Sequence, residues 1–455
     1  MQKGERNPSN IGKAIIIPAS FTGSKRYMFK DSLAICQTLG HPSVFLTMTT
    51  NTKWPKIQRM LKHMPGVDVA DAPDVVARVF KMKVDQLMDM IKKKNCFGRC
   101  IGVMHVIEFQ KRGLPHTHIL IWLHPDDRPK TTEQIDKMVS AEIPDPGIDP
   151  VGYNAVSNYM IHGPCGPDYT KSPCMVKGNC INHFPKRYNS HTFFDECGFP
   201  IYKRRRTGIT INKKGVNLDN RFVVPFNHDL LIIKVPFQIL SKGSRHGNNV
   251  FEENTYRYFC NNPKKASKGP IDEVKHYLDG RYVCVSEASW RIFAFDIHSF
   301  WPSVERLPIH LPGEKHVSFK DGDVLEDVCD KAISKKTKLE AWFDANQNFP
   351  NARNYSYSEF PNKFTWHPRL GIWKKRKRGD VIGRLSEVHS SNGELLYLHM
   401  LLLRKKGSKY FEDLKTVNGH IHETFKEACA ALGLLQNDNQ WHESIAEKSH
   451  TSLPP

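Results

Sequence analysis

Residues 109–123, FQKRGLPHTHILIWL, constrain the fold of this chain more than any other segment. Side chains alternate between the two faces of a β-strand, so a strand over these residues places His116 and His118 on the same face. Two imidazoles at that spacing form a chelating pair. Spacing alone leaves a second interpretation open, which is a solvated strand face that binds nothing.

A second strand-like segment, residues 103–110, precedes a turn-prone stretch that contains Gly113 and Pro115. We expect an antiparallel hairpin that pairs Gln110 with His116 and Glu108 with His118. One face of that hairpin is then apolar core, formed by Val103, Ile107, Phe109, Ile119, Ile121 and Leu123. The opposite face gathers a donor set suited to a divalent cation, Mg²⁺ or Mn²⁺, with positions open for phosphate oxygens: Glu108, Gln110, His116 and His118.

The charge balance favours a polyanionic partner. The 455 residues include 66 Lys and Arg against 47 Asp and Glu, a formal charge of +19. We expect DNA, because each Lys or Arg that neutralises a phosphate releases counterions whatever the base sequence. Basic runs are often only solvated faces, and the two expected to contact phosphate are Lys203, Arg204, Arg205 and Arg206, and Lys374, Lys375, Arg376, Lys377 and Arg378.

Several features indicate the compartment. The sequence has no window of about 18 apolar residues, so no membrane span is expected. The first residues, MQKGERNPSN, lack the apolar segment of a secretory signal, and WKKRKR at residues 373–378 is a candidate nuclear address. Eleven cysteines in such a chain favour reduced thiols or a metal over a disulfide framework.

A Cys- and His-rich segment, residues 162–184, offers a second group of metal donors. Three cysteines and one of two histidines could close a tetrahedral zinc site, from the set His162, Cys165, Cys174, Cys180 and His183. The alternative is that these are reduced cysteines in a loop rich in Pro and Gly. A phosphate-binding G-x-x-x-x-G-K-[ST] loop does not occur, so the sequence gives no support for ATP-driven chemistry.

The pattern of elements predicts an α+β fold. We expect a central antiparallel sheet that carries the His-x-His site and is flanked by helices, followed by a Cys-rich insertion and a smaller C-terminal α+β region. Four segments are predicted: residues 1–130 as the N-terminal part of the core, 131–200 as connector and Cys/His segment, 201–270 as a basic region, and 271–455 as the C-terminal region.

Blocks across most of the chain carry a family resemblance. They include SFTGSKRYM at 20–28, FLTMTTNTKWPKI at 45–57, VIEFQKRGLPHTHILIWL at 106–123, SAEIPDP at 140–146, MIHGPCG at 160–166, DEVKHYLDGRYVCVSEASWRIF at 272–293 and TVNGHIHETFKEACAALGLL at 416–435. These blocks resemble the Helitron helicase-like N-terminal region. The resemblance implies a replication-initiator type endonuclease of rolling-circle transposons, in which two histidines and a third polar ligand bind a divalent metal and tyrosine attacks single-stranded DNA.

Carried onto this sequence, the resemblance places the metal ligands at His116 and His118, with Glu108 or Gln110 as the third. The family's paired tyrosines, in a pattern like IKYLFKYVNKG, align with IKVPFQILSKG at 233–243 and fall on Val235 and Ile239. Pro236 disfavours the helix that would hold them. Tyr256 and Tyr258 lie nearby, but their spacing suits a strand face better than a helical pair.

The resemblance therefore implies an ancestral nicking and joining enzyme whose cleavage is impaired in this copy. Two alternative hypotheses remain: a single-stranded DNA-binding module without chemistry, and a zinc-stabilised structural protein. Full-length relatives continue into a helicase, and we expect no helicase activity from the residues present here.

Overall fold

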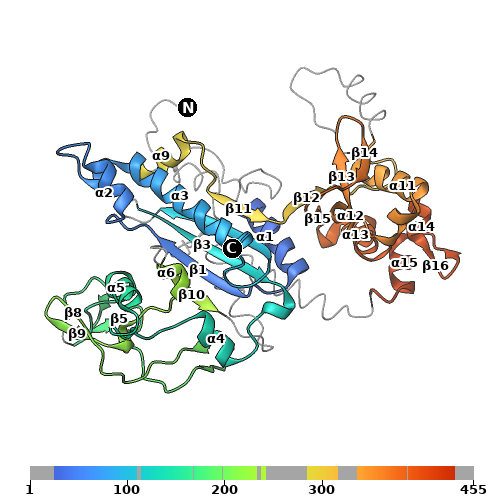
Figure 1. The fold of residues 1–455 in the computed structure, drawn as a ribbon. Coiled ribbons are helices and arrows are strands. Elements are labelled where there is room, and N and C mark those ends of the chain that lie inside the picture. The colour runs from blue at the N-terminus through green and yellow to red at the C-terminus, as the bar shows by residue number, and fades with distance from the viewer. Residues whose placement is uncertain are drawn as a thin grey trace, which may run out of the picture. The chain divides into compact units, whose positions relative to one another are not determined.

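The computed structural model in Figure 1 describes residues 25–109, 114–167, 169–196, 198–232, 237–241, 284–315, 336–386 and 388–435. Contacts divide the chain into two compact units. The first takes Met1–Ser32, Leu39–Ala266 and Ile271–Trp301, and the second takes Leu33–Thr38, Ser267–Pro270 and Pro302–Pro455.

A five-stranded sheet with the strand order β10-β1-β3-β2-β11 forms the centre of the first unit. Its strands are β1 (Val44–Thr49), β2 (Cys100–Phe109), β3 (Pro115–Leu123), β10 (Phe237–Ser241) and β11 (His298–Trp301). Every neighbouring pair in this order is antiparallel. The predicted α+β class with a central antiparallel sheet is therefore confirmed. The middle strand β3 is buried along its whole length.

One face of this sheet packs against helix α3 (Pro73–Lys92), which crosses it in Figure 1. Apolar residues recur in α3 at helical spacing and are all buried: Val76, Phe80, Val84, Leu87 and Ile91. Helices α2 (Pro55–Leu61) and α9 (Val285–Ile292) pack against α3. Of the side chains predicted as the core face of the hairpin, all but Phe109 belong to the buried core between the sheet and α3, and Phe109 is partly buried against that core. The prediction is therefore confirmed. Each large apolar side chain buried there contributes roughly 1.5–3 kcal/mol.

The other face of β2 and β3 is contacted by Ser32 and Leu39 of helix α1 (Lys25–Leu39) and by Gly40, which follows it. Ser32 Oγ donates to Met104 Sδ at 3.1 Å, and the indole of Trp122 donates to the Gly40 carbonyl at 2.7 Å. A Cβ at Gly102 would lie 2.5 Å from Leu39 Cδ1, so a larger residue there would force the Leu39 side chain to move. Further along the strands, the same face carries the two histidines.

A separate hydrophobic core lies within residues 143–231, and we call residues 140–232 the Cys/His module. Its helices are α5 (Pro150–Tyr159), η4 (Asn220–Phe222) and α6 (His228–Ile232), and α4 (Thr132–Met138) precedes it. Its strands are only two or three residues long: β4 (Met175–Val176), β5 (Asn179–Cys180), β6 (Phe193–Phe194), β7 (Pro200–Ile201), β8 (Ile211–Lys213) and β9 (Val216–Leu218). The module thus has little backbone ladder to hold it. Single-turn helices η2 (Val69–Asp71) and η3 (Pro125–Asp127) complete the described elements of the first unit.

The second unit has its own core around Trp342, Tyr357 and Phe360. Its helices are α11 (Lys338–Asn348), η5 (Pro350–Asn354), α12 (Phe360–Lys363), η6 (Ser390–Asn392), α13 (Glu394–Arg404), α14 (Phe411–Lys415) and α15 (Phe425–Ala431). Its strands are β12 (Ser303–Leu307), β13 (Phe364–His367), β14 (Ile372–Lys375), β15 (Val381–Leu385), β16 (Thr416–Val417) and β17 (His420–Ile421). Among the helices of the described ranges, none combines the length and the apolar character needed to cross a membrane.

Candidate metal centres

Three donor atoms converge on the sheet of the first unit. His116 Nε2 lies 3.1 Å from His118 Nε2 and 3.2 Å from Glu108 Oε2, and His118 Nε2 lies 3.4 Å from the same carboxylate oxygen. Both imidazoles are buried, whereas the Glu108 side chain is 43% exposed. We call these three residues the sheet site. Two ring nitrogens and a carboxylate oxygen pointed at one another are a donor set that fits a divalent metal.

The hairpin that builds the sheet site has a different register from the predicted one. Glu108 pairs with His116, Val106 pairs with His118, and Phe109 pairs with Pro115. The predicted pairing of Glu108 with His118 is therefore wrong by two residues. Pro115 already belongs to the strand, and its carbonyl accepts a hydrogen bond from the amide of Thr50, the residue after β1. A shift of two keeps every side chain on its face, so the donors still converge. Gln110 lies outside the described residues.

Strand β1 supplies a support for the sheet site that the sequence analysis missed. Thr47 Oγ1 lies 2.9 Å from His118 Nδ1, directly across the β1–β3 pairing. The ring of His118 also stacks on Phe45, with centroids 5.6 Å apart. If Thr47 accepts from Nδ1, it fixes the tautomer that leaves the Nε2 lone pair for a metal. Period-two alternation in the sequence VFLTMT could have indicated Thr47, but only once the β1–β3 pairing was known.

The electrostatics of the sheet site favour an ionised carboxylate. The imidazoles of His116 and then His118, which lie within hydrogen-bonding distance, hold the pKa of Glu108 well below its usual range, although partial burial acts in the opposite direction. The Nδ1 atom of His116 is buried and has no hydrogen-bond partner within the described part of the chain. The two histidines therefore differ. Among the described residues, Thr47 lies within hydrogen-bonding distance of His118 Nδ1, and no residue does so for His116 Nδ1.

Of the two positions aligned with the family's tyrosines, the structure describes only Ile239. Ile239 lies on strand β10, opposite Leu46 of β1, so the backbone over Phe237–Ser241 is a strand and not a helix. Val235, Tyr256 and Tyr258 lie outside the described residues, so the loss of the nucleophile stays a prediction.

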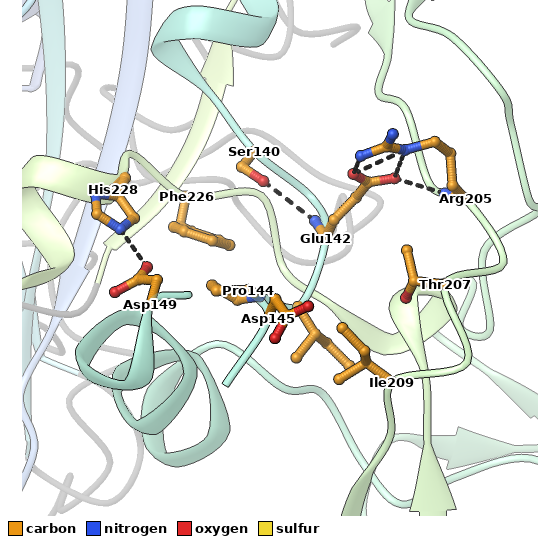
Figure 2. Close-up of a pocket in the computed structure, with 11 residues that line it drawn as sticks. Ser140, Glu142, Pro144, Asp145, Asp149, Arg205, Thr207, Ile209, Phe226 and His228 are labelled. Atoms are coloured by element: carbon orange, nitrogen blue, oxygen red, sulfur yellow. Dashed lines mark hydrogen bonds and ion pairs between the residues drawn. The ribbon is translucent and has the colours of Figure 1, made fainter. Parts of the chain in front are cut away.

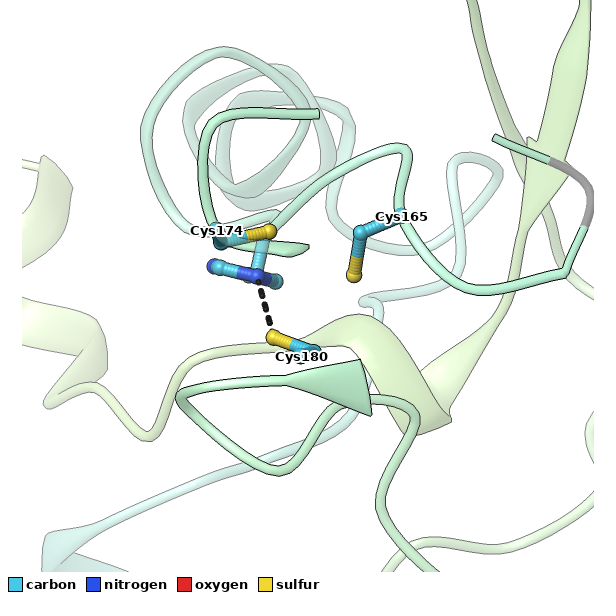
Figure 3. Close-up of side chains that lie close together, drawn as sticks. Cys165, Cys174 and Cys180 are labelled. Atoms are coloured by element: carbon cyan, nitrogen blue, oxygen red, sulfur yellow. Dashed lines mark hydrogen bonds between the residues drawn. The ribbon is translucent and has the colours of Figure 1, made fainter. Parts of the chain in front are cut away.

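A second group of donors lies in the Cys/His module, and we call it the Cys/His cluster. Its members are His162, Cys165, Cys174 and Cys180, whose ligand atoms all lie within 4.8 Å of one another. Figure 3 shows the three thiols turned towards one another. His162 Nε2 is 3.3 Å from Cys180 Sγ, and no disulfide is formed among these cysteines. His183, the other predicted histidine, is not in the group.

Two turns bring the members of the Cys/His cluster together. Lys177 and Gly178 both have positive φ, as the two central residues of a tight hairpin turn require. This turn joins β4 to β5. The amide of Ile181 donates to the Cys174 carbonyl at 2.9 Å, so Cys174 and Cys180 meet at the open end of that hairpin. Gly163, with φ of +109°, turns the chain between His162 and Cys165 in a conformation that other residues rarely adopt.

The thiols of the Cys/His cluster have unequal environments. Burial, followed by contacts with Cys180 and Cys174, raises the pKa of Cys165 to about 12. Burial also acts to raise the pKa of Cys180, but the backbone amides of Phe184 and Asn182 outweigh it and the pKa is lowered. The His162 pKa is lowered by burial and by the charge of Lys186. Cys180 is therefore the cluster thiol whose pKa is shifted towards the thiolate, the form in which cysteine binds metals.

The basic run at residues 203–206 is mostly engaged within the protein. Arg204 is 4% exposed, and its guanidinium donates to the carbonyls of Asn220 and Val223, so the expectation that it contacts phosphate is corrected. Lys203 pairs with Asp136, and Arg205 forms a two-pronged pair with Glu142. Arg206 makes no ion pair with any described residue and lies over the ring of Tyr188, 4.8 Å from its centroid.

The second basic run lies on the β13–β14 hairpin of the second unit. Lys374, Lys375, Lys377 and Arg378 are exposed and form no ion pair with any residue that the structure describes. Arg376 differs, because its guanidinium donates to the carbonyls of Pro361 and Phe364 and so anchors the hairpin. Four of these five cations remain accessible to a polyanion.

A pocket of about 440 Å³ lies in the first unit, and sequence reasoning did not predict it. Figure 2 shows that residues of the SAEIPDP block line it together with Arg205, Phe226 and His228. Two pairs of its lining residues bond to each other: Glu142 forms an ion pair with Arg205, and Asp149 lies 2.6 Å from His228 Nε2. Neither the sheet site nor the Cys/His cluster opens into this pocket.

The fold and the sheet site define an α+β domain with a His-x-His pair on the central strand of an antiparallel sheet, arranged to bind a metal. Residues 1–121 match the family model described as the Helitron helicase-like domain at the N-terminus, which confirms the resemblance for that part of the chain. All three donors of the sheet site fall within the match, whereas the Cys/His cluster and the second unit lie beyond it. A comparison with curated proteins gives no significant match.

Proposed function

We propose that this chain is a Helitron-derived, replication-initiator-like protein that binds single-stranded DNA and presents the sheet site to a DNA phosphodiester. The convergence of Glu108, His116 and His118 on one face of adjacent strands carries the proposal. The Helitron-like match over residues 1–121 supports DNA as the partner class.

In this proposal the metal at the sheet site is Mg²⁺ or Mn²⁺, held by the two Nε2 atoms and the Glu108 carboxylate. Two imidazoles in the donor set favour Mn²⁺ over Mg²⁺, which prefers oxygen ligands. When bound, such an ion polarises a phosphoryl oxygen and neutralises charge that develops there. Glu108 stays ionised because its pKa is so low, and Thr47 with Phe45 holds the ring of His118 in place.

Strand cleavage by a tyrosine is proposed to be weak or absent in this copy. The family positions hold Val235 and Ile239, which have no hydroxyl to form a phosphotyrosyl bond, and a strand runs through Ile239. Tyr256 and Tyr258 are the tyrosines that would have to replace them. A second candidate function, a single-stranded DNA-binding module without chemistry, is favoured by the same observation.

The proposed DNA contacts are the accessible cations, Arg206 in the first unit and Lys374, Lys375, Lys377 and Arg378 in the second. Charge on exposed side chains attracts phosphate without reading sequence. The same run, WKKRKR, is the proposed nuclear address, and its exposed cations, Lys374, Lys375, Lys377 and Arg378, are the ones that a transport receptor could reach.

The test is incubation of the full chain with end-labelled single-stranded DNA, with and without Mn²⁺. We expect binding that weakens steeply with salt, and little or no product or covalent adduct. His118→Gln should leave binding nearly unchanged, because the sheet site supplies few of the phosphate contacts. Efficient metal-dependent cleavage would overturn the impairment, and Tyr256→Phe with Tyr258→Phe would then identify the nucleophile. Absence of DNA binding at low salt would overturn the proposal as a whole.

A further inference from the structure

The proposed DNA chemistry does not use the Cys/His cluster. The position of its donors in the chain and their burial indicate a different role. Its four donors come from two segments with little regular structure, the turn after α5 and the open end of the short β4–β5 hairpin, where Cys180 is the last residue of β5. Cys165 and Cys180 are members of the module's hydrophobic core, so the cluster lies inside the module.

We propose that the Cys/His cluster is a closed zinc site that holds the Cys/His module together and takes no part in the chemistry of the sheet site. Three sulfurs and one imidazole nitrogen are the donor set of a structural zinc, and four protein ligands leave no position open for water or substrate. This inference is independent of whether the sheet site acts on DNA.

The size of the cluster agrees with that of a tetrahedral zinc site. Zn–S bonds of about 2.3 Å place two sulfur ligands about 3.8 Å apart, and a shorter Zn–N bond brings sulfur and nitrogen somewhat closer. The observed Sγ to Nε2 distance from Cys180 to His162 is 3.3 Å, and no pair of donor atoms in the cluster exceeds 4.8 Å. Small movements of side chains would therefore complete the coordination.

The chemistry of the cluster also favours a metal over unligated thiols. Without a metal, three thiols and an imidazole that face one another attract each other only through weak hydrogen bonds. Such bonds compensate little of the desolvation cost of burying these groups. The Cys174 thiol has Ser172 Oγ at 3.3 Å as its other polar neighbour. An ion that binds all four donors satisfies them at once.

The ion would also fix the chain that follows the cluster. The ring of His162 stacks on Phe184 with centroids 4.3 Å apart, and Lys186 Nζ lies 5.1 Å from the centroid of the Phe184 ring. The amide of Lys186 donates to the carbonyl of Arg221 at 3.0 Å, which ties this segment to η4. Loss of the ion should therefore loosen residues 160–190, and the core strands of the sheet should not respond.

The experiment measures metal content and coordination in the full-length chain. Protein purified without chelator should contain about one zinc per chain, and replacement by Co²⁺ should give an intense thiolate-to-cobalt absorption in the near ultraviolet. The sheet site has no sulfur donor, so this band reports the Cys/His cluster alone. Cys174→Ser should lower zinc content and the cobalt band severalfold, whereas Cys284→Ser, at a half-buried cysteine outside the cluster, should change neither.

A second readout keeps the proposal falsifiable if Cys174→Ser fails to fold. Titration of the unaltered chain with a mercurial should release its zinc as cluster thiols react, and His116→Gln should leave that release unchanged. Zinc-free protein without a thiolate-to-cobalt band would overturn the proposal. A band that survives Cys174→Ser at full intensity would also overturn it, because the sulfur donors would then be other cysteines.

Discussion

The sheet site and the Cys/His cluster are built in opposite ways. The donors of the sheet site lie on long, paired strands, and the ladder between β2 and β3 holds Glu108 opposite His116 without help from an ion. The donors of the Cys/His cluster lie on turns and two-residue strands. The donors of the sheet site are therefore preorganised by the fold, whereas the Cys/His cluster needs its ion to organise the fold around it.

The largest expected effect comes from removing metal with a chelator. Residues 160–190 should lose their amide protection, because a structural zinc contributes on the order of 10 kcal/mol in small zinc domains. Strands β2 and β3 should keep theirs. Hydrogen exchange on the full chain before and after chelation measures both regions together. Equal loss of protection in the two regions, or no loss in residues 160–190, would show that the ion does not hold the Cys/His module together.

A smaller effect is expected when a ligand of the sheet site is replaced. His118→Gln should weaken Mn²⁺ binding more than the roughly 10–100-fold that loss of a supporting partner costs, since it removes a ligand itself. The unfolding transition should hardly move, because the ladder stays. Calorimetric titration with Mn²⁺ and a denaturant melt are the two measurements. A variant that unfolds while the Cys/His cluster stays intact would show that the sheet depends on its metal.

Acid should weaken the sheet through a residue that belongs to neither donor group. Burial, followed by the charges of Lys92 and Lys81, lowers the pKa of His105 on β2 to about 4. Because the folded state disfavours the charged imidazole, the stability that His105 contributes is present above about pH 6.5 and is lost as the pH falls towards 4. Over that interval, the contribution of His105 to the free energy of unfolding falls by about 3 kcal/mol.

The check on this acid effect is the free energy of unfolding at several pH values between 7 and 4, for the unaltered chain and for His105→Gln. The variant should show a flatter pH dependence over that interval. A variant with the same slope as the unaltered chain would assign the acid sensitivity to other groups.

The support from β1 should matter less than the ligands. Thr47→Val keeps the β-branched shape but removes the hydroxyl beside His118 Nδ1, so Mn²⁺ affinity should fall about 10–100-fold. Thr49→Val is the matched control, because Thr49 is exposed on the same strand, opposite His116, and no described residue bonds to its hydroxyl. If both variants bind Mn²⁺ alike, Thr47 does not position the ring.

The smallest effect concerns individual basic residues. Lys374→Gln should lower the slope of log affinity for single-stranded DNA against log salt by about 0.7, because one phosphate contact is lost. Arg204→Gln should instead destabilise the module, since the buried guanidinium satisfies two backbone carbonyls. Salt titrations of DNA binding, alongside melting curves, separate the two outcomes. A normal melting curve for Arg204→Gln would contradict its structural role.

The residues differ in how far the sequence could predict them. Period-two alternation was enough to place His116, His118 and Glu108 on one face, and it survived an error of two in the register. The convergence of the cysteines with His162, and not His183, depended on turns at Gly163 and Lys177–Gly178 that no periodicity reveals. Arg204 looked like its neighbours in a basic run, and only the tertiary packing of residues 141–223 made it a buried donor. Thr47 required the long-range β1–β3 pairing.

Binding of Mn²⁺ to the zinc-loaded chain, followed by electron paramagnetic resonance, tests most directly the claim that two separate metal centres exist. We expect one bound Mn²⁺ in the unaltered chain with zinc retained, loss of that Mn²⁺ in His118→Gln, and no effect of Cys284→Ser on either metal. Mn²⁺ binding that is unchanged in His118→Gln, or Mn²⁺ that binds only by displacing the zinc, would contradict it.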